Sequence, residues 1–302
     1  MTARVACSSV RRDERMHVWQ GVGRGAHGRH HAKHNYWSSR FMSKLNKRVA
    51  LVTGGGRGIG RSIALAYARA GADVAITSRT ARELDSVVKE IEGLGVRGLA
   101  VVADAMSHED SQRAVATVVE KLGGIHILFN NAGGVALPKT ADGLAAATHE
   151  DEAFVANIML NLVSAQRMSR EALPHMIKQR WGRIIHIGSG YAKRGGGLLA
   201  YTAAKHGIVG LTRGMATEVA QHGVTVNCLC PGWTNTSLLD WDMLGAAWGV
   251  DATTAKARAS AECLQNRIVE PDELGPMAVL LASDDGHGIT GQVLSVDGGY
   301  KV

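Results

Sequence analysis

The chain has 302 residues, 45% of them hydrophobic, and a formal net charge of +7. Residues 1–46 carry nine basic and two acidic side chains, whereas the remaining 256 residues carry 25 of each sign, so the excess positive charge belongs to the N-terminal segment alone. The neutral body has enough apolar material for a core, and this composition argues against a basic nucleic-acid groove, a fully disordered chain and a membrane-spanning helix.

Residues 1–46 lack helical or strand periodicity, so we expect a basic, disordered N-terminal extension. Its Arg-rich composition faintly resembles an organelle transit peptide, but it has no amphipathic stripe and no apolar core of a secretory signal. Met42 is followed by SKLNK (43–47) and then a predicted strand, as at an ordinary start, so residues 1–41 are interpreted as an upstream in-frame extension or as sequence added for expression. The four cysteines form no regular framework, which is typical of a reducing compartment, and we expect a cytoplasmic protein without a metal site.

From residue 47 on, short β-branched runs alternate with helical stretches. Strands are predicted at Arg48–Thr53, Asp73–Thr77, Gly98–Ala103, Ile125–Phe129, Arg183–Ile187, Thr225–Leu229 and Gln292–Val296. Helices are predicted at Ile59–Ala70, Ala81–Leu94, Glu109–Leu122, Glu152–Gln179 and Ala200–His222. This alternation predicts a single doubly wound α/β domain of Rossmann type over residues 47–302, with a parallel sheet flanked by helices on both faces. Ligands of such sheets bind beyond the carboxyl ends of the strands.

A glycine-rich loop follows the first predicted strand. The sequence TGGGRGIG (residues 53–60) lies between that strand and a helix, which is the position of a dinucleotide-binding loop. Glycine lets the backbone approach a pyrophosphate, and the helix N-terminus supplies free N–H groups. The predicted loop contacts come from Gly54, Gly56, Arg57, Gly58, Ile59 and Gly60.

The end of the second strand indicates which nicotinamide cofactor is preferred. NAD-binding proteins place an acidic residue there, whereas this chain has Ser78 followed by Arg79. Arg79 and the loop residue Arg57 could pair with a 2′-phosphate, so the sequence predicts NADP(H) over NAD(H), unless both side chains are merely solvated. Further cofactor contacts are predicted after the third and fourth strands, at Asp104, Ala105, Asn131, Ala132 and Gly133.

Tyr201 and Lys205 are four residues apart on a predicted helix, so they project from one face. An ammonium group favours phenolate and lowers the pKa of a neighbouring tyrosine toward the range of acid–base catalysis. Ser189 directly follows a strand and can donate a hydrogen bond to a substrate carbonyl. His186 and His206 adjoin these residues, and packing or surface roles are predicted for them.

Taken together, these motifs resemble the short-chain dehydrogenase/reductase family over about residues 47–302, and 3-oxoacyl-carrier-protein reductases in particular. The matching pieces are TGGGRGIG (53–60), NNAG (130–133), Asn161, Ser189, YTAAK (201–205), Pro231-Gly232 and VDGG (296–299). The interval from Ser189 to Tyr201 is one residue shorter than the commonest family pattern, which puts the shape of the pocket in doubt more than catalysis.

The resemblance implies a role for each of these residues. Tyr201 would be the general acid or base, Lys205 would lower its pKa and hold the nicotinamide ribose, Ser189 would polarise the carbonyl, and Asn161 would hold a water for proton resupply. Pro231, Gly232, Thr234 and Thr236 would border the nicotinamide. A homotetramer or homodimer is implied as well.

The segment Trp233–Asn266 falls where the family has its substrate lid. Its tryptophans and aliphatic side chains favour an apolar or bulky carbonyl or alcohol, unless the segment packs on a neighbouring subunit. Three functions remain open. They are an NADPH-dependent ketone reductase of the 3-oxoacyl type, an alcohol, sugar-acid or hydroxysteroid dehydrogenase working oxidatively, and a catalytically silent protein that senses the cofactor.

Overall fold

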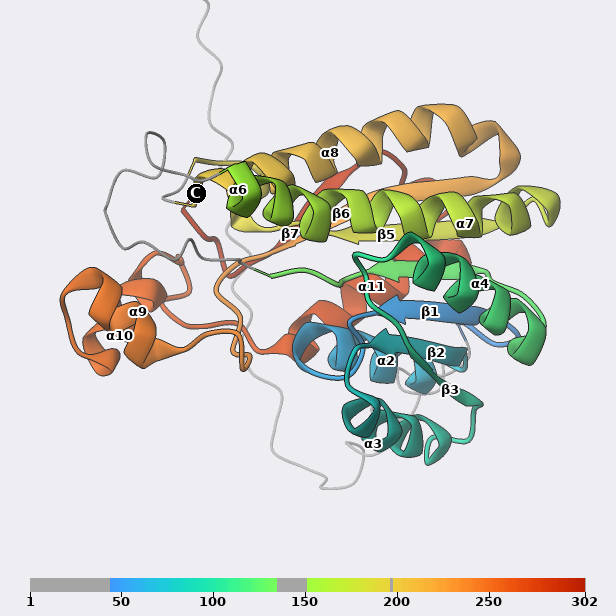
Figure 1. The fold of residues 1–302 in the computed structure, drawn as a ribbon, viewed down its shortest axis with the longest axis horizontal. Coiled ribbons are helices and arrows are strands. Elements are labelled where there is room, and N and C mark those ends of the chain that lie inside the picture. Colours follow the sequence, from blue (N-terminus) through green and yellow to red (C-terminus); the bar gives the residue numbers. More distant parts are fainter. Residues whose placement is uncertain (1–43, 135–150, 196–197, 302) are drawn as a thin grey trace, which may run out of the picture. The chain divides into compact units, whose positions relative to one another are not determined.

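Within the described residues, seven parallel strands form one sheet in the order β3-β2-β1-β4-β5-β6-β7 (Figure 1). The computed structural model describes residues 44–134, 151–195 and 198–301, and residues 1–43 of the expected extension lie outside this part of the chain. The strands are β1 (Val49–Thr53), β2 (Asp73–Ser78), β3 (Gly98–Val102), β4 (Ile127–Asn130), β5 (Gly182–Ile187), β6 (Val224–Pro231) and β7 (Val293–Val296). The predicted doubly wound α/β fold is confirmed.

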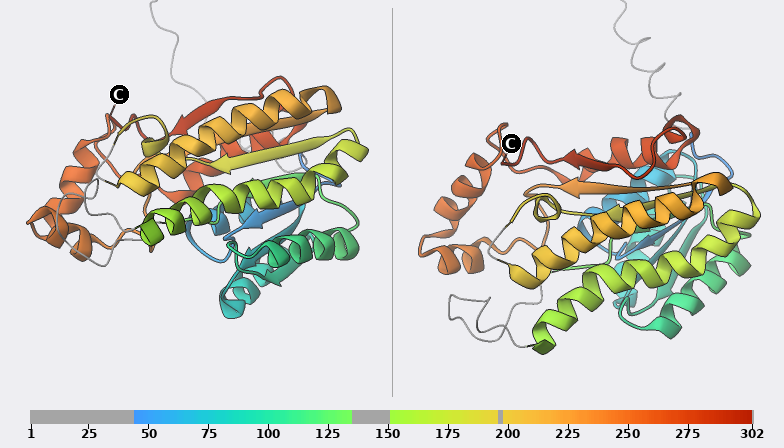
Figure 2. Two further views of the ribbon diagram at one scale, coloured as in Figure 1. Left: turned by 45° about the horizontal axis from the view of Figure 1, so that its top comes forward. Right: turned by 90° about the horizontal axis from the view of Figure 1, so that it is seen from above.

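Helices cover both faces of the sheet (Figures 1 and 2). One face packs against α2 (Gly58–Arg69), α3 (Ala81–Glu92) and α11 (Gly275–Ala282). The other face packs against α4 (His108–Leu122), α7 (Ser164–Lys178) and α8 (Leu199–Val219). The chain reverses its winding direction at β1, which pairs with β2 on one side and β4 on the other. Ligands of open α/β sheets bind at such a switch point, beyond the carboxyl ends of the strands.

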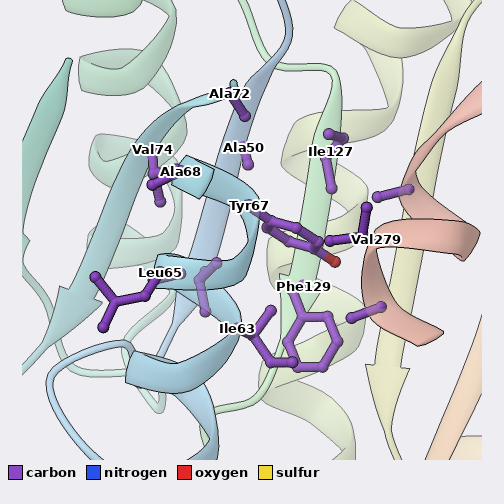
Figure 3. Packing of buried hydrophobic residues seen from close by; sticks show 14 of the residues in the cluster. Ala50, Ile63, Leu65, Tyr67, Ala68, Ala72, Val74, Ile127, Phe129 and Val279 are labelled. Atoms are coloured by element: carbon purple, nitrogen blue, oxygen red, sulfur yellow. The ribbon is translucent and has the colours of Figure 1, made fainter. Parts of the chain in front are cut away.

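Side chains from both faces of β1 are buried, which is why the strand is a continuous apolar run. On the α2 face, Tyr67 packs edge-on against Phe129 of β4, with ring centroids 6.2 Å apart (Figure 3). The Tyr67 hydroxyl is buried and has no hydrogen-bond partner among the described residues. Burial therefore raises the pKa of Tyr67, and its ring serves the packing of the core rather than a polar network.

The predicted helix Glu152–Gln179 is interrupted in the structure. It consists of α6 (Asp151–Ile158), a π-helical turn (Met159–Val163) and α7. The lid region folds into α9 (Trp241–Trp248) and α10 (Ala252–Ala261), and α11 was missed by the sequence analysis although Pro276 marks its first turn. Among the described residues, no helix is both long enough and apolar enough to cross a membrane.

Candidate active site

A cleft of about 260 Å³ opens at the carboxyl ends of β1, β2, β3 and β4. Its walls are formed by Gly54, Gly56, Arg57, Gly58, Ile59, Thr77, Ser78, Arg79, Thr80, Glu83, Ala103, Asp104, Ala105, Met106, Asn131, Ala132, Gly133, Leu160, Thr236, Ser237 and Leu238. Most of the residues predicted to contact the cofactor therefore line one cavity. Thr77, Thr80, Glu83, Ala103, Met106, Leu160, Ser237 and Leu238 are lining residues that the sequence analysis missed.

The glycine loop forms a cradle that side chains would fill. Gly54 and Gly58 have φ angles of +63° and +54°, a region that favours glycine. A Cβ atom on Gly60 would lie 2.1 Å from the main-chain oxygen of Gly54, so only glycine fits there. The N-terminus of α2 has no side-chain cap and no acidic residue in its first turn, which leaves its positive end available to an anion. These features fit the pyrophosphate of a dinucleotide.

The turn after β4 is tied to this loop by hydrogen bonds. Thr53 Oγ1 accepts from the main-chain N–H groups of Asn131 and Ala132, both at 2.9 Å. The side-chain amide of Asn131 donates to the main-chain oxygen of Gly54 at 3.1 Å. The two loops that would hold a dinucleotide from opposite sides are therefore one rigid unit.

Catalytic chemistry is expected at Ser189 and Tyr201, and the structure brings them together. Ser189 follows β5, Tyr201 lies in the first turn of α8, and their hydroxyl groups are hydrogen-bonded. Burial raises the pKa of Tyr201, and the hydrogen bond from Ser189 lowers it, with burial the stronger influence. The phenol of Tyr201 thus keeps its proton at neutral pH. This differs from the lowered pKa expected from Lys205, because the structure gives the ammonium no direct bond to the phenol oxygen.

Lys205 is buried one helical turn after Tyr201, with Nζ 5.4 Å from the centroid of the Tyr201 ring. Its Nζ donates to the main-chain oxygen of Ile187 at 3.1 Å. Burial lowers the pKa of Lys205 to about 8, against a smaller raising effect of the thiols of Cys228 and Cys230. The amine can therefore exchange protons within the physiological pH range, which suits a residue that takes part in proton transfer.

The two thiols beside Lys205 were not singled out from the sequence as part of the site. Cys228 and Cys230 are buried on β6 with their sulfur atoms 3.7 Å apart. A Cβ on Gly188 would lie 2.5 Å from Cys230 Sγ and 2.7 Å from Cys228 Sγ. Gly188 is the residue before Ser189, and because it has no side chain the two thiols fit beside it.

Asn161 lies in the π-helical turn and is buried. Its amide nitrogen donates to the main-chain oxygens of Gly134 and Asn157, at 2.8 and 3.1 Å, and its Oδ1 accepts from Gly134 N at 3.1 Å. Counting partners among the described residues, these bonds leave one acceptor position of the side chain for a water molecule. Most of the hydrogen-bonding capacity of the Asn161 side chain is therefore used to hold Gly134. Gly134 directly follows the NNAG turn (130–133).

Aromatic rings connect Tyr201 to the predicted lid region, Trp233–Asn266. The Tyr191 ring lies edge-on to Tyr201 at 6.0 Å, and its hydroxyl is hydrogen-bonded to Tyr300. Tyr300 in turn packs on Trp233 at 6.4 Å and is hydrogen-bonded to Glu262, which also accepts from Trp233 Nε1 at 2.8 Å. This network joins the two ends of the lid region to the residue beside Tyr201.

The lid tryptophans pack mainly on one another. The Trp233 ring has its centroid 6.4 Å from Trp241 and 6.0 Å from Trp248. These rings thus form a partly buried aromatic cluster. Two other side chains of the lid region are more exposed: Leu238 is 61% and Met243 47% exposed. Leu238 also lines the cleft, so the lid region contributes to its walls.

The remaining predicted residues divide into two groups. Thr236 lines the cleft, whereas Gly60, Pro231, Gly232, Thr234, Ser189, Tyr201 and Lys205 are not part of its walls. Thr234 is buried, and its hydroxyl donates to the main-chain oxygen of Gly232 at 3.0 Å, so it supports the loop rather than the cleft surface.

The packing role predicted for His186 is confirmed. Its ring is fully buried, and Nδ1 lies 3.1 Å from the side-chain amide of Asn130. Burial lowers the pKa of His186 to about 3, so the ring is neutral at physiological pH. His206 is exposed, as predicted. Among the described residues, no group of three His, Cys, Asp or Glu side chains could hold a metal ion.

Comparison with known proteins shows consistent similarity. The sequence model for short chain dehydrogenases matches residues 48–242. The chain is 35% identical to the oxidoreductase UcpA of Salmonella typhimurium over 85% of its length and 96% of that protein. It is 36% identical to the 3-oxoacyl-acyl-carrier-protein reductase FabG of Pseudomonas aeruginosa over 84% of its length and 98% of that protein. A variant of actinorhodin polyketide ketoreductase with NADPH superposes with a TM-score of 0.79 at 32% identity, covering 86% and 99% of the two chains.

Proposed function

Because the chain belongs to the short chain dehydrogenase family, we propose that it is an NADPH-dependent reductase of ketones, with 3-oxoacyl groups as the first substrate class to test. It is an oxidoreductase of that family. The observation that carries the proposal is the hydrogen-bonded pair of Ser189 and Tyr201, with buried Lys205 one turn away, next to a cleft shaped for a dinucleotide.

Tyr201 would act as the general acid when a carbonyl is reduced and as the general base in the reverse reaction. Burial raises its pKa, so the phenol holds the proton that a reduced carbonyl oxygen needs. Ser189 would donate a hydrogen bond to the same carbonyl oxygen and orient it toward Tyr201. Lys205, whose pKa is lowered to about 8, would return a proton toward Tyr201 after each turnover. NADPH, when bound, supplies the hydride.

The cleft supports binding of the cofactor with its pyrophosphate at Gly54–Gly60 and its adenosine end near Ser78, Arg79 and Asp104. Exposed guanidinium groups of Arg57 and Arg79 line this cavity and favour the extra phosphate of NADP(H). Asp104 Oδ1 accepts a hydrogen bond from Met106 N at 2.9 Å, and Asp104 lies on the wall where adenine would lie.

Oxidation of NADPH, followed by its absorbance, tests the proposal against a panel of 3-oxoacyl thioesters, steroids, quinones and small ketones. We expect turnover with at least one ketone and a lower KM for NADPH than for NADH. Turnover of alcohols with NADP⁺ in the absence of any ketone reduction would contradict the proposed direction. A protein that binds the cofactor but turns over no member of the panel or the corresponding alcohols would contradict catalysis itself.

We further propose a homotetramer or homodimer. Val155 on α6 is 54% exposed and Leu199 at the start of α8 is 40% exposed, and paired helices of this kind bury such side chains in symmetric assemblies. Light scattering coupled to gel filtration gives the mass, and a monomer at micromolar concentration would overturn this part.

A further inference from the structure

Glu83 introduces a carboxylate at the adenosine end of the cleft. It lies in the first turn of α3, five residues after the end of β2, and it is one of the lining residues. A Cβ atom on Gly56 would lie 3.2 Å from Glu83 Oε2 and 3.3 Å from Ser78 Oγ. The carboxylate therefore lies against the phosphate loop, on the side where β2 ends.

Three charged side chains meet at this end of the cavity. Arg57 and Arg79 contribute guanidinium groups, and Glu83 contributes the opposite charge. Across the described ranges, none of the three forms an ion pair. Their charges are thus available to a ligand. The guanidinium groups favour a ligand with a phosphate, because they pair with it. The carboxylate favours a ligand with free ribose hydroxyls, because it accepts hydrogen bonds from them and repels phosphate.

We infer that Glu83 is a specificity-determining residue that weakens the discrimination between NADP(H) and NAD(H). It accepts a hydrogen bond from the adenosine ribose of NAD(H), and it opposes the 2′-phosphate that Arg57 and Arg79 attract. The inference rests on the proposed function, because it requires that the cleft bind a nicotinamide dinucleotide. Its consequence is that the wild-type protein uses both cofactors, with a preference for NADP(H) smaller than the two arginines alone would give.

A purely structural role makes a different prediction. An acidic side chain in the first turn of a helix interacts favourably with the helix dipole, and Glu83 is the acidic residue of that turn in α3. Loss of this interaction would lower the melting temperature slightly and leave the ratio of the two affinities unchanged. The ratio therefore separates the two roles.

The test is direct binding, measured by calorimetry, of adenosine 2′,5′-bisphosphate and adenosine 5′-monophosphate, followed by NADPH and NADH. The test variant is Glu83→Gln. The control is Glu92→Gln, which makes the same change of charge on the same helix at a side chain that is exposed and outside the cleft. Removing one negative charge about 6 Å from a phosphate at a protein surface changes affinity by about tenfold. We expect Glu83→Gln to raise the preference for the 2′-phosphorylated ligands by about tenfold and Glu92→Gln to leave it within about twofold.

The outcomes separate this inference from the proposed function. If folded wild-type protein binds neither dinucleotide, the proposed function is wrong. If it binds them and Glu83→Gln changes the ratio no more than Glu92→Gln does, the proposed function stands and the role of Glu83 is overturned. Glu83→Ala, which keeps a strong helix former at the position, provides the same measurement if the Gln variant is poorly soluble.

Discussion

The ammonium of Lys205 is bonded to the main-chain oxygen of Ile187 at 3.1 Å, only two residues before Ser189. The end of β5 therefore fixes both the cation and the serine hydroxyl, while α8 carries Tyr201 and Lys205 on consecutive turns. The positions of β5 and α8 thus determine the geometry of the residues proposed for acid–base chemistry, which are Ser189, Tyr201 and Lys205.

Replacing Tyr201 with Phe removes the proposed proton donor and keeps the ring that packs against Tyr191. We expect kcat to fall by about a thousandfold, because general acid catalysis contributes factors of this order. The affinity for NADPH, measured by calorimetry, should stay within about threefold. Tyr67→Phe, on the other face of the sheet, serves as the control and should keep full turnover. Retained activity in the Tyr201 variant would overturn the mechanism.

Lys205→Met should stabilise the protein while abolishing turnover. The folded-state pKa of Lys205 is about 8, below the ordinary value of 10.5, so burying the ammonium costs about 3 kcal/mol at neutral pH. The hydrogen bond to Ile187 offsets about 1 kcal/mol of this. The free energy of unfolding of the variant, measured by urea denaturation at neutral pH, should thus exceed that of the wild type by about 2 kcal/mol.

The pH dependence of this gain has a defined sign. A lysine whose pKa is lowered on folding destabilises the folded state fully below about pH 8, and the penalty disappears as the pH rises toward 10.5. The difference between wild type and Lys205→Met should therefore shrink with increasing pH. A gain that is constant across this range, or a net loss of stability at neutral pH, would show that the ammonium is better solvated than its burial implies.

Gly188→Ala tests the space shared with the two thiols. The new Cβ would lie 2.5 Å from Cys230 Sγ, so we expect a loss of about 1–3 kcal/mol from overpacking. Adding Cys230→Ala should recover part of that loss, measured as a coupling energy by urea denaturation, and the contact at 2.7 Å with Cys228 Sγ would remain. Cys263→Ala, which removes another buried cysteine, is the matched control and should recover nothing. Equal recovery by both would mean that the contact with Cys230 is not the cause.

Tyr300→Phe and Tyr67→Phe are an informative pair, because both tyrosines are buried and only one has partners for its hydroxyl. The Tyr300 hydroxyl is hydrogen-bonded to Tyr191 and Glu262, so its loss should cost about 1 kcal/mol. The Tyr67 hydroxyl has no partner among the described residues, so its removal should be neutral or stabilising by about 1 kcal/mol. Thermal melting in parallel measures both, and the same sign for the two variants would contradict this assignment.

Many of the residues that line the cleft could be predicted from the sequence, because they directly follow strands. Gly54, Asn131 and Asp104 each lie within a few residues of a strand end, and parallel strands deliver their carboxyl ends to one edge. Glu83 was missed, since its approach to Gly56 depends on the angle at which α3 leaves β2. The position of Cys228 and Cys230 beside Gly188 depended on the register of β6 against β5. The pKa of Tyr201 was expected to fall, and the structure raises it because burial outweighs its hydrogen bond.

The pairing of the last described residues has a consequence for how the protein is made. Gly298 and Gly299 accept main-chain hydrogen bonds from Gln265 and Leu264, and Lys301 N–H bonds to the oxygen of Glu262, directly after α10. The nucleotide loops, in contrast, are complete once β4 has been synthesised. The glycine loop and the turn after β4 can therefore form before the lid region does, because the lid region gains these main-chain contacts only after residues 298–301 have been synthesised.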